Sequence, residues 1–213
     1  MRSEWVPLSA SALVTGAVAL LMAQFLSPTG GGDAGLAESM RLASENAGQW
    51  IAMSMLWALS SVCFILGVPS VLTLFPRRGK VLGWTGGVVF AIGAVGLSGL
   101  AAMAMIFRAM ADSGIAVADI QAALDQPEIR VLLLIWIFGM FIGWVLMAIG
   151  LLRARTVPAW IPVLLLVFVV LAWLLEGVYL AERASWIALA AAFTGMAIYA
   201  VDPSRHKPAR AES

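Results

Sequence analysis

The sequence predicts an all-α polytopic membrane protein, a bundle of six transmembrane helices with its amino and carboxyl ends in the cytoplasm. Hydrophobic residues make up 62% of the 213 residues and charged residues only 12%, whereas soluble domains are about a quarter charged. The apolar residues gather into six runs, most of them near or above the roughly 20 residues that cross a bilayer. No stretch shows the alternation of apolar and polar residues that barrel strands require.

Each run is assigned as a helix because lipid leaves every backbone polar group to be satisfied within its own segment. The first run is interpreted as a retained helix and not as a cleaved signal peptide. Its apolar stretch exceeds a typical signal core, and Ser27-Pro28-Thr29 is a poor cleavage site. The spans are expected at about 7–26, 49–75, 81–109, 130–152, 159–181 and 185–201, so that residues 1–201 form one transmembrane domain and 202–213 a polar cytoplasmic tail.

Orientation follows from Lys and Arg in the short loops. The turns after the second and fourth spans contain five basic residues and no acid: Arg77, Arg78, Lys80, Arg153 and Arg155. The connections on the opposite side, 27–47 and 111–130, carry more acids than bases. Both chain ends are therefore expected on the cytoplasmic side of the inner (plasma) membrane.

Two segments on the outer side, 34–46 and 116–126, are predicted to be short amphipathic helices. Leu36 and Met40, and likewise Ile120 and Leu124, lie four residues apart and so share a helix face. Each segment leads into a helical hairpin with a basic turn. This repeated order is either an internal repeat, as many transporters have, or a chance likeness between short hairpins.

Small residues and tryptophans indicate where the helices meet. Gly83, Gly87 and Ala91 recur at every fourth position, and Gly139 and Gly143 share that spacing. Small residues let helix backbones approach closely in lipid, so these stripes predict contacts inside the bundle. Trp50 and Trp186 are expected at the outer boundary of the membrane. The deeper tryptophans are expected between helices or facing lipid: Trp57, Trp136, Trp144 and Trp173.

The residues that familiar intramembrane chemistry requires are missing from the predicted spans. The single histidine, His206, is in the tail, and the two lysines, Lys80 and Lys207, lie outside the spans. Cys63 is the one cysteine and is expected to be a small buried hydrophobe. We therefore predict no catalytic residue, cofactor or metal, and the net charge of +1 gives no indication of a nucleic-acid partner.

Ionisable residues inside spans are costly and are candidates for function. Arg108 is placed near the outer end of the third span and Glu176 in the outer half of the fifth, with Gln24, Gln49 and Tyr179 at similar depth. These five residues either line a ligand-binding cavity or reach water independently at the interface. Because the third and fifth spans run in the same direction, Arg108 and Glu176 are expected to pair.

Several segments carry a resemblance to a known family: QW at 49–50, VLTLF at 71–75, LGWTGG at 82–87 and GLLRARTVPAW at 150–160. In these the chain is similar to small bacterial six-helix membrane proteins that are grouped as a domain of unknown function. The resemblance covers most of the chain and implies the six-helix fold. It implies no activity, cofactor or site residue.

Three functions stay open at this point. The first is a non-enzymatic membrane protein that binds a partner protein or lipid, favoured by the lack of catalytic sets and of a soluble domain. The second is a small-solute binding or transport component with a polar site in the outer half of the bundle. The third is an enzyme that acts on lipid through Glu176 and Arg108. The sequence does not indicate an oligomeric state.

Overall fold

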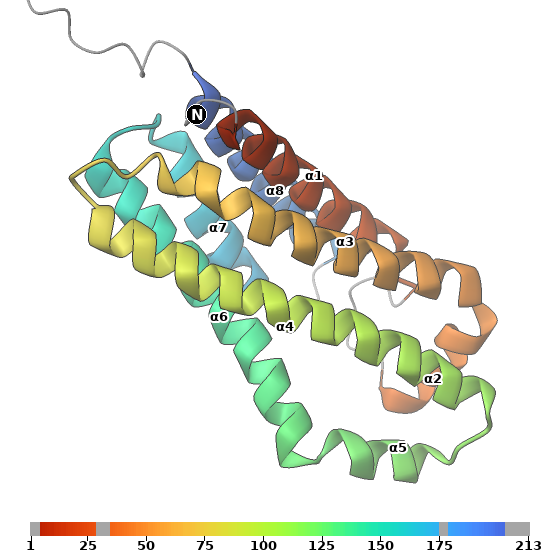
Figure 1. Ribbon diagram of the computed structural model, residues 1–213. Coiled ribbons are helices and arrows are strands. Elements are labelled where there is room, and N and C mark those ends of the chain that lie inside the picture. Colours follow the sequence, from red (N-terminus) through yellow and green to blue (C-terminus); the bar gives the residue numbers. More distant parts are fainter. Residues whose placement is uncertain (1–4, 29–34, 175–178, 203–213) are drawn as a thin grey trace, which may run out of the picture.

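The computed structural model describes residues 5–28, 35–174 and 179–202. Every regular element in these ranges is a helix, so the all-α prediction is confirmed (Figure 1). The helices are α1 (Trp5–Leu26), α2 (Leu36–Glu45), α3 (Ala47–Leu72), α4 (Lys80–Asp112), α5 (Val117–Leu124), α6 (Pro127–Ala154), α7 (Trp160–Leu174) and α8 (Tyr179–Val201).

Five of these helices, α1, α3, α4, α6 and α8, are long and apolar enough to cross a membrane. The fifth predicted span differs from the structure. The described part of α7 has 15 residues, or about 23 Å at 1.5 Å per residue, and residues 175–178 after it lie outside the described ranges. Residues 179–181, expected in that span, belong to α8. Helix α8 starts earlier than predicted because Leu, Ala, Glu and Arg at 180–183 are all strong helix formers.

Six helices form a closed ring in which each packs against the next, in the order α1, α3, α4, α6, α7, α8 and back to α1. Helices α1, α3 and α4 run side by side, while α6 crosses α4 and then leans away from it toward α5 (Figure 1). The α3–α4 and α6–α7 turns, the start of α1 and the end of α8 lie at one end of the bundle. Helices α2 and α5 lie at the other end (Figure 1).

Aromatic rings fill the centre of the ring of helices. Phe90 of α4 lies 5.1 Å from Phe64 of α3 and 5.6 Å from Phe193 of α8, measured between ring centroids. All three are fully buried. The outward faces are also apolar, since Val88 and Val95 of α4 are more than half exposed. Apolar side chains inside and outside suit a bundle whose surroundings are lipid.

Helices α4 and α6 touch backbone to backbone. A Cβ added to Gly93 would lie 2.3 Å from the backbone nitrogen of Met140 and 2.5 Å from the carbonyl carbon of Gly139, and one added to Gly143 would lie 2.7 Å from Cα of Phe90. The predicted contact through Gly139 and Gly143 is therefore confirmed. These contacts need glycine because any side chain would separate the helices.

The predicted stripe of Gly83 and Gly87 is also an internal contact, mainly with the end of α3. An added Cβ would lie 2.3 Å from the ring of Phe75 at Gly83, and 2.8 Å from Cδ2 of Leu72 at Gly87. Helix α4 therefore has two glycine-bearing faces. Gly87 packs on α3, and Gly86 and Gly93 pack on α6. Gly83 lies against Phe75 of the α3–α4 turn and also borders Gly150 of α6.

Serine hydroxyls join neighbouring helices by donating to backbone carbonyls. Ser60 Oγ donates to Gly16 O of α1 at 2.8 Å, and Ser61 Oγ donates to Ala94 O of α4 at 2.6 Å. Such interhelical bonds stabilise membrane bundles by about 0.6 kcal/mol each. Cys63 on the same helix is buried, as predicted.

The two short amphipathic helices are present, as predicted, as α2 and α5. Met40 of α2 and Ile120 of α5 are buried, so the apolar faces of both helices pack on the bundle.

Trp50, expected as an anchor at the membrane boundary, is instead 7% exposed. Its Nε1 donates to Ala104 O of α4 at 2.8 Å, and its ring stacks on Phe107. Trp50 therefore joins α3 to α4 and does not face the membrane boundary.

Candidate functional site: a tryptophan-lined cavity

The polar residues that the sequence singles out lie in different surroundings. Arg108, near the end of α4, pairs with Asp112 of the same helix, with 2.8 Å between Nη2 and Oδ2. Gln49 is exposed in the first turn of α3. Gln24 of α1 lines an internal cavity. These three candidates therefore do not share one cavity.

Glu176 and the side chain of Tyr179 lie outside the described residues. The pairing of Arg108 with Glu176 therefore stays a prediction. In the described residues the Arg108 side chain is 26% exposed and its Asp112 partner 43% exposed. Its Nε is buried and has no hydrogen-bond partner within the described ranges.

A cavity of about 200 Å³ lies inside the ring of helices. It borders the α4–α6 contact, because a Cβ added to Gly96 would lie 2.8 Å from Cα of Trp136, a residue of the lining. Five helices, α1, α3, α4, α6 and α8, contribute tryptophan or other large apolar side chains to its walls, and Gln24 is the one amide among them. The lining residues are Leu20, Gln24, Trp57, Leu97, Leu100, Trp136, Met140, Phe141, Trp144 and Trp186.

Two tryptophans of the cavity have unused hydrogen-bond donors. The indole Nε1 atoms of Trp57 and Trp144 are buried, and neither has a partner among the residues that the structure describes. Trp144 is only 2% exposed. A buried donor without a partner costs about 1–3 kcal/mol, so each is expected to have an acceptor in the working protein. Both side chains line the cavity, so a ligand oxygen there would supply one after a small rotation of the indole ring.

The aromatic wall around Trp144 is held in place by ring contacts. The Trp144 ring lies 4.9 Å from Phe168 of α7 and 5.2 Å from Phe141, both edge to face. Phe168 in turn lies 5.0 Å from Trp186 of α8. Edge-to-face pairs of this kind favour one ring orientation, so the cavity wall is preorganised.

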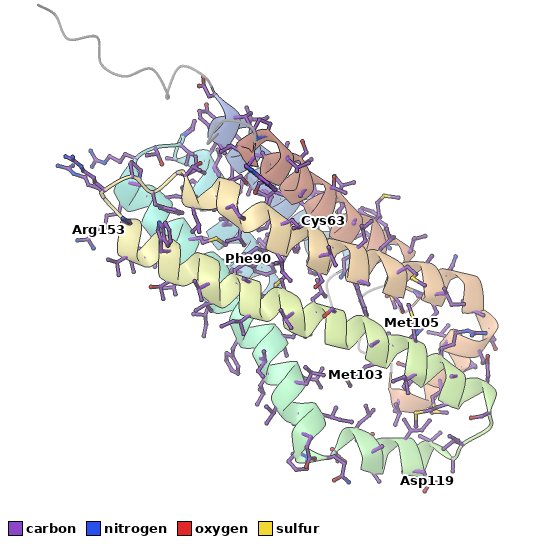
Figure 2. The ribbon with its side chains drawn as sticks, in the orientation of Figure 1. Cys63, Phe90, Met103, Met105, Asp119 and Arg153 are labelled. Atoms are coloured by element: carbon purple, nitrogen blue, oxygen red, sulfur yellow. The ribbon has the colours of Figure 1, made fainter. Side chains whose placement is uncertain are left out.

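The cavity adjoins a larger apolar groove toward α2 and α5. Trp57 and Leu100 line both the cavity and this groove, which has a volume of about 410 Å³. Leu36 of α2 and Leu124 of α5 line its outer part, together with Met103 of α4. Figure 2 shows Met103 in the space between α4 and α6. A continuous apolar surface therefore leads from the cavity to the end of the bundle where α2 and α5 lie.

The sequence predicted the deeper tryptophans between helices or facing lipid and Trp186 at the outer boundary, and grouped none of them into a site. The side chain of Trp173 lies outside the described residues. One signal was present. Trp136, Met140 and Trp144 are spaced by four and therefore share a face of α6. Trp57 and Trp186 come from distant segments and join that face only when the ring of helices closes.

No set of three His, Cys, Asp or Glu side chains within the described ranges could hold a metal ion. The chain matches no family model, no curated protein and no solved structure. Its fold and site define an all-helical chain with five helices suited to crossing a membrane and an apolar cavity among them.

Proposed function

We propose that the chain is a multi-pass protein of the inner (plasma) membrane, with six spans and both ends in the cytoplasm. Support comes from the apolar outward faces and from the distribution of charge. The basic turns at Arg77–Lys80 and Arg153–Arg155 lie at one end of the bundle, and α5 lies at the other. Four acids are in or next to α5: Asp112, Asp119, Asp125 and Glu128. That separation is typical of a cytoplasmic basic end.

A matched pair of cysteines tests this orientation in a Cys63→Ala background. Ala159→Cys lies in the α6–α7 turn and Ala118→Cys lies in α5, both at exposed positions. We expect a membrane-impermeant maleimide added to intact cells to label Ala118→Cys and not Ala159→Cys until the membrane is opened. Labelling of both variants from the same side would contradict the topology. Gly79 is unsuitable for this purpose because a Cβ there would lie 2.3 Å from Gly150 O.

The proposed function is non-enzymatic binding of a lipid or lipid-like molecule in the tryptophan-lined cavity. The observation that carries it is the buried pair of unpartnered indole donors, Trp57 and Trp144, on the wall of an apolar cavity. The best-fitting ligand has an uncharged oxygen acceptor to meet these donors and an apolar portion to fill the cavity and groove.

A polar solute fits the same walls less well. Its groups would need several hydrogen-bond partners once removed from water, and the described lining offers only the Gln24 amide and the indole N–H groups. An apolar molecule needs fewer partners and gains from the aromatic surface. The cavity also adjoins a groove lined by α4, α5 and α6, which gives a molecule dissolved in the bilayer a direct approach.

Native mass spectrometry of the gently purified protein tests this function. We expect an adduct of lipid-like mass that contains a carbonyl or hydroxyl oxygen. Trp144→Phe keeps the ring and removes the N–H, so it should weaken retention of the adduct roughly fivefold, the equivalent of one hydrogen bond of about 1 kcal/mol.

Trp84→Phe is the matched control, since Trp84 is 46% exposed on α4 and does not line the cavity. Equal retention in the two variants would contradict a role for the Trp144 donor. Absence of any adduct from the wild-type protein would contradict the proposed function itself.

A further inference from the structure

A second binding site is indicated at the opposite end of the bundle, where the two basic turns converge. A hollow of about 820 Å³ lies between the α3–α4 turn and the α6–α7 turn. Its lining includes five cationic side chains and no acid: Arg77, Arg78, Lys80, Arg153 and Arg155. We call this site the basic cradle. Figure 2 shows Arg153 at this end of the molecule.

The cradle is built by contacts that bring like charges together. Thr156 Oγ1 donates to Leu74 O at 2.7 Å and so ties one turn to the other. Gly79, with φ of 73°, sits so close to α6 that a Cβ would lie 2.3 Å from Gly150 O. These contacts hold the cationic side chains around one space although their charges repel.

The backbone of Arg155, one of the five cationic residues, has an unusual conformation. Arg155 ends α6 with φ of 53°, the one positive φ outside glycine among the described residues. A non-glycine residue in this region costs about 1–2 kcal/mol, and such strain gathers at functional sites. The strained turn places Arg155 on the lining of the cradle.

The cations of the cradle are free to meet an outside anion. The structure shows no salt bridge to any of the five within the described ranges. Lys80 makes a different contact, with its Nζ 5.7 Å from the centroid of the exposed Trp84 ring. The basic residues at the other end, Arg41 and Arg130, are already paired with Glu38, Glu45 and Asp125.

We propose that the basic cradle binds the phosphates of an anionic phospholipid, most tightly one with two phosphates, since the cations come from two separate turns. Basic pockets at the cytoplasmic ends of helices bind such headgroups. A lipid fits better than free phosphate because apolar side chains border the hollow. Val81 is 79% exposed and Leu152 is 40% exposed beside it, where acyl chains would lie.

The test is lipid binding by the full chain in detergent, using cardiolipin, phosphatidylglycerol, phosphatidylcholine and inorganic phosphate as probes. We expect the order cardiolipin, phosphatidylglycerol, phosphatidylcholine, from strongest to weakest. The double variant Arg78→Gln/Arg153→Gln should bind cardiolipin roughly 25-fold more weakly, at about fivefold for each cation removed. The charge-conserving double variant Arg78→Lys/Arg153→Lys should keep most of the cardiolipin binding. It is the control that two substitutions at these positions leave the fold intact.

The double variant Arg41→Gln/Arg130→Gln is the matched control, because it removes two cations from the other end. An equal loss of cardiolipin binding in this control would overturn the proposal, since it would indicate attraction by net charge alone. Displacement of cardiolipin by millimolar inorganic phosphate would also overturn it, because the site would then bind free anions.

Discussion

Replacing Gly93 by alanine is expected to destabilise the protein by about 3 kcal/mol, at the upper end of the usual cost of overpacking. The added methyl carbon would lie 2.3 Å from the backbone nitrogen of Met140 and 2.5 Å from the carbonyl carbon of Gly139. Backbone atoms of a helix cannot relieve the overlap by a change of rotamer, as a side chain can, so α4 and α6 must separate. Their separation weakens the neighbouring contacts at Gly86 and Gly143 as well.

Two other Gly→Ala variants are controls for this result. At Gly87 the methyl group meets Cδ2 of Leu72, a side-chain atom that can move, so the cost should be small. At Gly48, in the first turn of α3, nothing lies within 4 Å, and alanine should stabilise the helix by about 0.5–1 kcal/mol. Thermal unfolding in detergent measures all three. A Gly93→Ala melting temperature equal to that of Gly87→Ala would contradict the α4–α6 contact.

The fold was largely predictable because helices in lipid are specified by length and hydropathy. Helices α1, α3, α4 and α6 begin and end within a few residues of the predicted spans, and α2 and α5 match the amphipathic segments. The prediction differed at residues 179–181, which were assigned to the fifth span and belong to α8. Hydropathy alone does not assign such residues to one of two consecutive apolar helices.

The α4–α6 contact shows what pattern reasoning missed. A spacing of four predicted the stripe at Gly83 and Gly87, of which Gly87 packs on α3 and Gly83 on Phe75 of the following turn. The closest contact with α6 uses Gly86 and Gly93, seven residues apart. At 3.6 residues per turn a step of four drifts by about 40° around the helix, and a step of seven by about 20°. The spacing of seven therefore keeps to one face over a longer distance.

The cavity could be predicted only in part, because its walls come from five helices that the sequence does not place in order. The spacing of Trp136 and Trp144 indicated one wall, whereas the arrival of Trp57 and Trp186 depends on closure of the ring. The charged residues within the predicted spans did not indicate the cavity. Arg108 has a carboxylate four residues further along its own helix, and that local partner is the one the structure shows.

Filling the cavity is expected to abolish ligand binding without unfolding the protein. Leu100 lines both the cavity and the groove, so Leu100→Trp places an indole ring in the space of about 200 Å³ that a ligand would occupy. Leu20→Phe narrows the same cavity from α1 and is an independent second variant. Leu134→Trp is the control, because Leu134 is 48% exposed on the outer surface of α6.

The central measurement is native mass spectrometry of these variants beside the wild-type protein, with melting temperatures recorded to show that each is folded. Binding in the cavity predicts that the wild-type protein and Leu134→Trp carry the same lipid-like adduct, and that folded Leu100→Trp and Leu20→Phe have lost it. An adduct retained at the wild-type fraction in both cavity variants would contradict the account, because the bound molecule would then lie outside the tryptophan-lined cavity.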